Sequence, residues 1–315
     1  MKSNLKSWLV LTRCSNLPTV WSNVISGWLL GMAAVIRTPT VIVPSALNST
    51  LFTLLLGISL LYVAGMILND VFDYEWDCAN RPERPLPSGL ISRSKAKWVG
   101  IIILLLGLAL SAFSAGRFFK LTFLLTIFIL WYDVAHKGNP LAPMVMGACR
   151  ALLPMIGFIV ATIDGIYAQP NIVHVYAVVL GIYTYALTWV AKYELTPTKN
   201  SYWIERLLFL IPLPLIVYYN YTYWSLGALI FYVLWIIFSN RRHPTPSGIS
   251  ARVADRIAAF SLLDSIVSGT ILLMIAPFCG TEPMIQVKEV AWLAILAPPI
   301  CLGITLWLRK FIPST

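Results

Sequence analysis

The chain has 315 residues, of which 58% are apolar and only 11% are charged. A soluble domain usually carries about twice that charged fraction, so the composition excludes an ordinary soluble protein. The net charge of +10 is compatible with nucleic-acid binding in general, but here the basic residues follow a membrane pattern, and nucleic acid is not expected as a partner.

Apolar segments recur along nearly the whole chain. A membrane-spanning helix needs about 20 mostly apolar residues. Candidate spans cover residues 17–36, 49–69, 97–115, 119–134, 141–162, 171–191, 204–219, 222–239, 256–277 and 288–308. Because the seventh and eighth segments are short and close together, we expect nine or ten spans. The predicted fold is an all-α, polytopic transmembrane helical bundle that forms a single domain over residues 1–315.

Lysines and arginines are distributed unevenly between the connections. Of the 23, eighteen lie in alternate connections and at the two ends, four lie in the other connections, and Arg150 falls inside a span. Basic connections stay on the cytoplasmic side of a membrane. We therefore expect a multi-pass protein of the cell inner (cytoplasmic) membrane, with its N-terminus in the cytoplasm.

A row of acidic side chains follows the second span. If the helix continues, Asp70, Asp73 and Asp77 lie on one face at spacings of three and four, and Asn69 borders them. Like charges on one face call for a compensating cation. Mg²⁺ suits this set, because it is a hard ion held by a few carboxylates plus substrate phosphates. The pattern predicts a metal site at these four residues, with the aspartates as catalytic groups. The alternative is an acidic helix end exposed to water.

A basic, proline-rich loop comes next. Arg81 and Arg84 lie within RPERPLPSG, where Pro85 and Pro87 prevent a helix from running through. Guanidinium groups match phosphate oxygens in geometry. Beside a magnesium site, the two arginines predict diphosphate binding, although taken alone they would only indicate topology.

The segment NDVFDYEWD, residues 69–77, followed by RPERPLPSG, resembles the first aspartate-rich motif, NDxxDxxxD, of the UbiA family of intramembrane prenyltransferases. The segment YDVAHKGN, residues 132–139, is similar to the family's short loop after the fourth helix, with Lys137 at its basic position. The resemblance extends from the opening RCSNLPTVWSN to the region of Arg256. That opening and the form AKYE look most like a UbiA-like branch of ebo-type bacterial biosynthetic clusters.

This resemblance implies a helical bundle around a central cavity that opens sideways to lipid. It also implies Mg²⁺ and an isoprenoid diphosphate held by carboxylate motifs, with transfer of the isoprenoid chain to an acceptor inside the bilayer. Arg81, Arg84 and Lys137 would lie near the diphosphate.

The second acidic motif of the family is reduced in this chain. The family usually carries further aspartates after the sixth helix, whereas this chain has TWVAKYELTPT, with one carboxylate at Glu194 beside Lys192. Either one magnesium ion suffices and Lys192 supplies charge to the substrate, or the chemistry differs from standard prenyl transfer. Glu194 is predicted to orient or deprotonate the acceptor.

Polar side chains inside two spans complete the predicted site. Asn16 and Asn23 lie on one face of the first span, where Gly27 and Gly31 favour close helix packing. Arg150 lies well inside the fifth span, where a charge is costly unless it is paired. All three polar residues are predicted to bind substrate, and for Arg150 a structural ion pair is an equally good interpretation.

The predicted function is Mg²⁺-dependent transfer of an isoprenoid chain from a prenyl diphosphate to an unidentified acceptor. One alternative is a UbiA-like enzyme that moves a phosphoribosyl-type group onto a polyprenyl phosphate. Another is a non-catalytic lipid carrier or transporter, although the acidic cluster at one membrane edge and the lack of an internal repeat favour an enzyme. The residues assign neither the acceptor nor an oligomeric state.

Overall fold

The computed structural model describes residues 2–38, 45–116, 119–162, 171–192, 203, 205–218, 222–244, 248–280 and 284–312. Within these residues every regular element is a helix, which confirms the predicted all-α class. The helices are α1 (Lys2–Leu11), η1 (Cys14–Asn16), α2 (Leu17–Ile36), α3 (Ser49–Phe72), α4 (Tyr74–Asn80), α5 (Arg93–Ala115), α6 (Phe119–Ala135), α7 (Ala142–Ala161), α8 (Asn171–Lys192), α10 (Leu213–Tyr218), α11 (Tyr223–Arg242), α12 (Ile249–Ala258), α13 (Phe260–Ile275), η4 (Ala276–Phe278) and α14 (Met284–Leu308).

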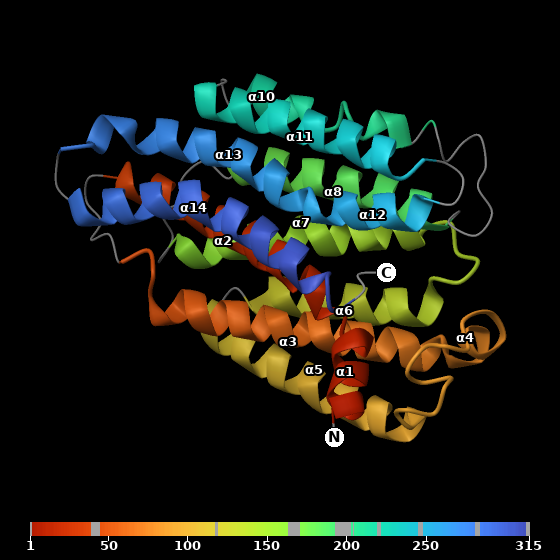
Figure 1. Cartoon of the computed structure of the whole chain (residues 1–315). Coiled ribbons are helices and arrows are strands. Elements are labelled where there is room, and N and C mark those ends of the chain that lie inside the picture. The colour runs from red at the N-terminus through yellow and green to blue at the C-terminus, as the bar shows by residue number, and fades with distance from the viewer. Residues whose placement is uncertain are drawn as a thin grey trace.

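Eight helical segments of the described chain are long and apolar enough to cross a membrane. The shorter α6 has 17 residues and is about 25 Å long at 1.5 Å per residue, which is at the lower limit for a span. The long helices run roughly along one common direction (Figure 1). The structure is therefore a polytopic helical bundle.

The predicted seventh span, residues 204–219, is not one continuous helix. Residues 208–212 form a turn, and the six-residue helix α10 follows it. Pro212 and Pro214 lie at this break, and prolines remove backbone donors and clash with the preceding turn of a helix. The prediction of a helical span here is corrected to two short helical pieces.

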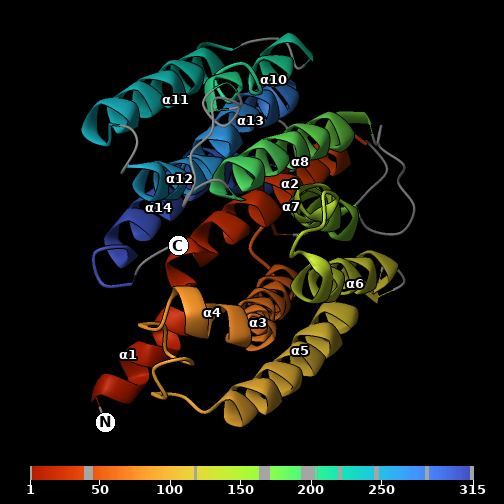
Figure 2. The same cartoon turned by 90° about the vertical axis from the view of Figure 1, so that its right-hand side faces the viewer.

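The helices form two groups that enclose the site. α3, α5 and α6 lie together on one side, and α2, α7, α8, α11, α13 and α14 lie on the other (Figure 2). α2 and α7 approach closely, since an added Cβ at Gly27 would meet the carbonyl oxygen of Pro154 at 2.1 Å and one at Gly157 would meet that of Val24 at 2.2 Å. The small residues of the first span therefore serve helix packing, as predicted.

The end of α14 lies near the start of α2. α14 contacts η1, which directly precedes α2. Just after α14, a guanidinium nitrogen of Arg309 also lies 3.7 Å from Oδ1 of Asp255 in α12. At its other end, Glu289 accepts hydrogen bonds from Ser45 and from the backbone of Ala46, both 2.9 Å. α14 therefore runs antiparallel to α2, and the two ends of the described chain lie on the same side of the bundle.

Candidate active site

A cavity of about 710 Å³ lies between the two groups of helices. Its polar end is formed where α3 meets α4 and by residues 136–139, and this end of the bundle is called the α4 end below (Figure 1). Farther in, the lining is mostly apolar and includes Val20, Ile58, Leu125 and Leu153. The cavity therefore suits an amphiphile with a charged head and an apolar chain.

The acidic row, defined here as Asp70, Asp73 and Asp77, continues the helical path of α3 into α4. The backbone nitrogen of Asp73 donates to the oxygen of Asn69, and that of Asp77 donates to the oxygen of Asp73, both at 2.9 Å. The three residues are only 4%, 8% and 1% exposed. The expected row exists, but it is buried, so the alternative of a water-exposed acidic helix end is wrong for these residues. By contrast, the carboxylate of Glu75 is exposed and pairs with Arg93.

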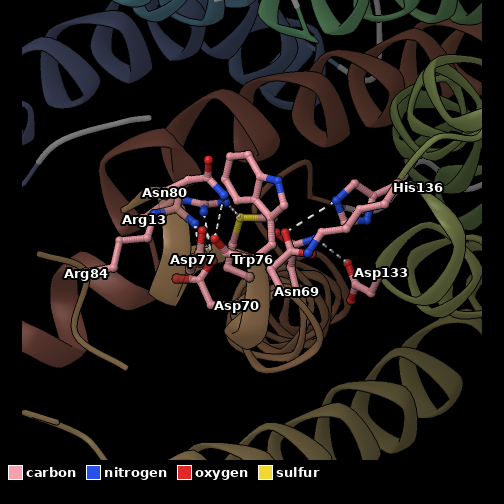
Figure 3. Close-up of polar contacts among 12 residues, drawn as sticks. Arg13, Asn69, Asp70, Trp76, Asp77, Asn80, Arg84, Asp133 and His136 are labelled. Carbon is pink, nitrogen blue, oxygen red and sulfur yellow. Dashed lines mark hydrogen bonds and ion pairs between the residues drawn. The ribbon is translucent and has the colours of Figure 1, made fainter. Parts of the chain in front are cut away.

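Two arginines neutralise the first and last members of the acidic row (Figure 3). Nη2 of Arg13 lies 2.8 Å from Oδ1 of Asp70. Nη1 of Arg84 lies 2.8 Å from Oδ2 of Asp77 and 3.4 Å from Oδ1 of Asp70. Arg13 has a φ of 43°, a strained left-handed conformation for a residue with a Cβ. Its carbonyl oxygen accepts a hydrogen bond from the hydroxyl of Tyr62 at 3.1 Å, which stabilises this conformation.

The middle carboxylate faces the loop after α6. Nζ of Lys137 lies 2.8 Å from Oδ1 of Asp73, and Nε2 of His136 lies 3.3 Å from Oδ2. Burial alone would raise the pKa of Asp73, but the hydrogen bonds and charges of these two residues outweigh it and lower the pKa below its usual value. Asp73 is therefore held as a carboxylate.

A second pair of polar side chains lies beside the acidic row. Nδ2 of Asn69 donates to Oδ1 of Asp133 on α6 at 3.3 Å (Figure 3). Because the amide nitrogen is used here, the amide oxygen of Asn69 points away from Asp133. The other oxygen of Asp133, Oδ2, is buried without a hydrogen-bond partner in the structure. This contact orients the only amide of the predicted metal set.

The predicted metal ligands fit a divalent ion by chemistry, although they do not form a complete coordination shell. Among the described residues, no three His, Cys, Asp or Glu side chains converge on one point. However, Mg²⁺ commonly takes only one or two carboxylates and completes its shell with water and substrate phosphates. Oδ1 of Asp77 is buried and accepts no hydrogen bond, and Asn69 and Asp73 also line the cavity. The oxygens therefore fit a metal that binds together with a diphosphate.

Most other predicted substrate-binding residues line the cavity. Asn16, Arg81, Arg84, Lys137, Arg150 and Lys192 all do so. The guanidinium of Arg81 lies 5.6 Å from the centre of the Trp76 ring. The ammonium of Lys192 lies 5.9 Å from the centre of the Trp189 ring. Glu194 lies outside the described residues.

Asn23 is placed elsewhere. It is fully buried, does not line the cavity, and its Nδ2 donates to both carboxylate oxygens of Asp264 at 2.8 and 2.9 Å. The hydroxyl of Tyr176 donates to the same carboxylate. In this structure Asn23 has a structural partner, and its substrate-binding role stays a prediction.

Three side chains of the site were not singled out from the sequence: Arg13, Asp133 and His136. His136 and Asp133 belong to the loop segment that resembles the UbiA family, and a carboxylate in an otherwise apolar helix is itself a signal of function. Arg13 was counted only as a basic residue of the cytoplasmic side. Its pairing with Asp70 spans 57 positions, and no local pattern predicts a contact at that separation.

Comparison with known proteins gives the class of this chain. Residues 24–252 match the UbiA prenyltransferase family, which is well over half of the chain. The chain therefore belongs to the UbiA prenyltransferase family, as the sequence motifs predicted. It is a multi-pass membrane prenyltransferase, and membership implies an isoprenoid diphosphate as a substrate.

Individual relatives share one name. The chain is 25% identical over 287 residues to a digeranylgeranylglyceryl phosphate synthase of Saccharolobus solfataricus, over 85% of this chain and 98% of the relative. It is 36% identical over 112 residues to the protein of that name from Thermococcus gammatolerans, over 35% and 40% of the two chains.

A solved structure described as a digeranylgeranylglyceryl phosphate synthase in membranes is similar with a TM-score of 0.58. It is 20% identical, and the match covers 85% of this chain and 99% of that chain. At this identity the likeness shows the fold.

Proposed function

We propose that this protein catalyses Mg²⁺-dependent transfer of an isoprenoid chain from a prenyl diphosphate to an acceptor within the membrane. The observation that supports this most strongly is the buried acidic row, of which Asp73 and Asp77 line the mouth of an apolar cavity while Asp70 lies behind them, paired with Arg13; Arg84 and Lys137 pair with Asp77 and Asp73. Carboxylates for a metal and cations for a diphosphate lie side by side there, with room for a hydrocarbon chain behind them.

The cations of the site have two alternative partners. In the structure they neutralise the acidic row, which is buried and would otherwise repel itself. If a metal and a diphosphate bound together, the carboxylates would hold the metal, and the guanidinium and ammonium groups would be free to bind phosphate oxygens. Arg81, which also lines the cavity mouth, provides a further cation for the diphosphate.

The transfer step breaks the bond between C1 of the isoprenoid chain and the diphosphate oxygen, and the electron pair leaves with the diphosphate. Mg²⁺, when bound by Asn69, Asp70, Asp73 and Asp77, supplies charge stabilisation for that leaving group. Arg84 and Lys137 hold the diphosphate at the α4 end. The acceptor then forms a bond to C1 and releases a proton. The apolar lining excludes water that would compete with the acceptor.

We propose that the residues that bind the acceptor lie at the end of α8 and directly after it in the chain. Lys192 supplies charge near the cavity mouth, and Glu194 orients the acceptor or takes its proton. The shared name of the relatives makes a lipid glyceryl phosphate one acceptor to test. The resemblance to the ebo-type branch and the distribution of basic residues favour a bacterial inner membrane, with the α4 end in the cytoplasm.

Binding of prenyl diphosphates tests this proposal. Purified protein in nanodiscs is incubated with prenyl diphosphates of several lengths, with Mg²⁺ or with EDTA, and bound ligand is measured by mass spectrometry. We expect binding that requires Mg²⁺ and that falls at least about 10-fold in Asp70→Asn, because the metal loses a charged ligand. Glu75→Gln, which removes an exposed carboxylate nearby, serves as the control.

Three other outcomes would contradict the proposal. Binding that is indifferent to Mg²⁺ would argue against the metal site. A product with a sugar–phosphate bond would indicate the phosphoribosyl-type reaction instead. Movement of an unaltered substrate across a vesicle membrane would indicate a carrier.

A further inference from the structure

Arg150 lies on the cavity wall deep inside α7. It is eight residues from Ala142, where α7 begins, which places it about 12 Å along the helix at 1.5 Å per residue. Ala142 and Arg150 both line the cavity. Arg150 therefore lines the cavity well inside the span, away from the end of α7 that follows the loop with Lys137.

Among the described residues, no carboxylate contacts the guanidinium of Arg150 directly. Its Nη2 donates to the carbonyl oxygen and to Oγ1 of Thr19, at 3.0 and 2.9 Å. The guanidinium carbon lies 3.8 Å from the centre of the Phe260 ring. Nε is buried and has no hydrogen-bond partner in the structure. Asp264 is a nearby buried carboxylate that offsets part of the charge of Arg150 without contacting the guanidinium, and its oxygens accept hydrogen bonds from Asn23 and Tyr176 instead.

A cation at this position does not help the donor half of the reaction. Positive charge develops on the isoprenoid chain as the diphosphate leaves, and a fixed guanidinium in the same cavity repels it. A charge inside a membrane span is also unfavourable unless it is paired. A negatively charged group of a ligand would resolve both problems, because it would neutralise Arg150 and screen its repulsion.

The neighbouring face of α8 has matching polarity. Thr184, Thr188 and Lys192 follow one another at spacings of four, so they lie on one side of the helix, and all three line the cavity. α7 packs along α8. The carboxylates of the described residues that line the cavity, Asp73, Asp77 and Asp133, come instead from the α3–α4 junction and α6. The lining from α3, α4 and α6 therefore carries these carboxylates together with the cations that neutralise them, whereas the α7/α8 wall carries cations and hydroxyl groups and, among the described residues, no carboxylate.

We propose that the α7/α8 wall is the acceptor subsite and that Arg150 binds an oxyanion, a phosphate or a carboxylate, carried by the acceptor. Thr184, Thr188 and Lys192 contact the remaining polar groups of that acceptor. This inference rests on the proposed prenyl transfer, to which it adds the chemical class of the acceptor. It explains why a guanidinium whose Nε has no hydrogen-bond partner lines the cavity deep inside a span.

Matched ligands test the inference in the full-length protein in nanodiscs. The probes are an alkylglyceryl phosphate and the corresponding alkylglycerol, and a long-chain hydroxy acid and its methyl ester. Binding is measured by calorimetry in the wild type, Arg150→Gln, Arg150→Lys and Arg93→Gln, the last being a charge-matched control at the exposed pair with Glu75. Affinity for a prenyl diphosphate with Mg²⁺ is measured in parallel.

We expect the wild type and Arg93→Gln to bind the charged member of one pair at least about 10-fold more tightly than its neutral counterpart. Arg150→Gln should lose that preference while its prenyl diphosphate affinity changes much less, and Arg150→Lys should recover part of the preference. The pair that shows the effect distinguishes a phosphate from a carboxylate.

Equal binding of both members of each pair by the wild type would overturn the inference, whether or not the variants fold. So would a preference that survives in Arg150→Gln, or a loss of prenyl diphosphate affinity by the same factor, which would place Arg150 in the donor site. If the wild type shows the oxyanion preference but no Mg²⁺-dependent prenyl diphosphate binding, the proposed function fails and the subsite remains.

Discussion

Asp73→Asn is expected to lower the rate of prenyl transfer at least about 100-fold, since the metal and the leaving diphosphate lose a charged group aimed at them. Asp73 is the member of the acidic row that both lines the cavity and contacts the loop cations, His136 and Lys137. The neutral amide keeps the shape of the side chain, so the protein should stay folded. Diphosphate release, measured with a saturating prenyl diphosphate and Mg²⁺, gives the rate.

Glu75→Gln is the matched control for this variant. It makes the same chemical change two residues away, but the carboxylate of Glu75 is exposed and pairs with Arg93, outside the cavity lining. Its rate should stay close to that of the wild type. A normal rate in folded Asp73→Asn would remove this carboxylate from the catalytic site.

Arg84→Gln is expected to destabilise the protein by about 3 to 5 kcal/mol, the usual effect of removing one partner of a buried ion pair. Asp77 is 1% exposed, and Arg84 is its ion-pair partner at 2.8 Å. Without Arg84 the carboxylate is left buried and uncompensated. Thermal unfolding in the same nanodisc preparation measures the change, and added Mg²⁺ should recover part of the loss because it replaces the missing positive charge.

The exposed pair of Arg93 with Glu75 again supplies the control. Surface ion pairs contribute about 0 to 1 kcal/mol, so Arg93→Gln should shift the unfolding temperature only slightly. If Arg84→Gln and Arg93→Gln unfold alike, or if Mg²⁺ has no larger effect on Arg84→Gln than on the wild type, Arg84 does not neutralise the acidic row in solution.

The acidic row could be predicted from the sequence because its geometry is local. Spacings of three and four place Asp70, Asp73 and Asp77 on one side of any helix that continues through them, and the structure shows that continuation with a single irregular residue at Asp73. Lys137 was identified differently, from the resemblance of the segment YDVAHKGN to a loop of the family. The sequence did not reveal that the row is buried, because burial depends on helices that are distant in the chain.

The contacts that could not be predicted from the sequence join residues that are far apart along the chain. Asn23 was expected at the cavity, but its amide donates to Asp264, 241 positions away. Arg13, which itself adopts a left-handed conformation just before η1, contacts Asp70, 57 positions away. The prediction of a seventh span was wrong for a local reason that the sequence itself shows, because Pro212 and Pro214 both fall within residues 204–219.

The central claim is transfer of an isoprenoid group to an acceptor, and the most direct test is to follow that group with an isotope label. Protein in nanodiscs that contain a bacterial lipid extract and an alkylglyceryl phosphate is given a deuterated prenyl diphosphate and Mg²⁺, and the lipids are analysed by mass spectrometry. The account predicts a labelled product heavier than its acceptor by one prenyl group, together with free diphosphate, and neither in EDTA. Free diphosphate without any prenylated product, or recovery of the intact donor with every acceptor offered, would contradict it.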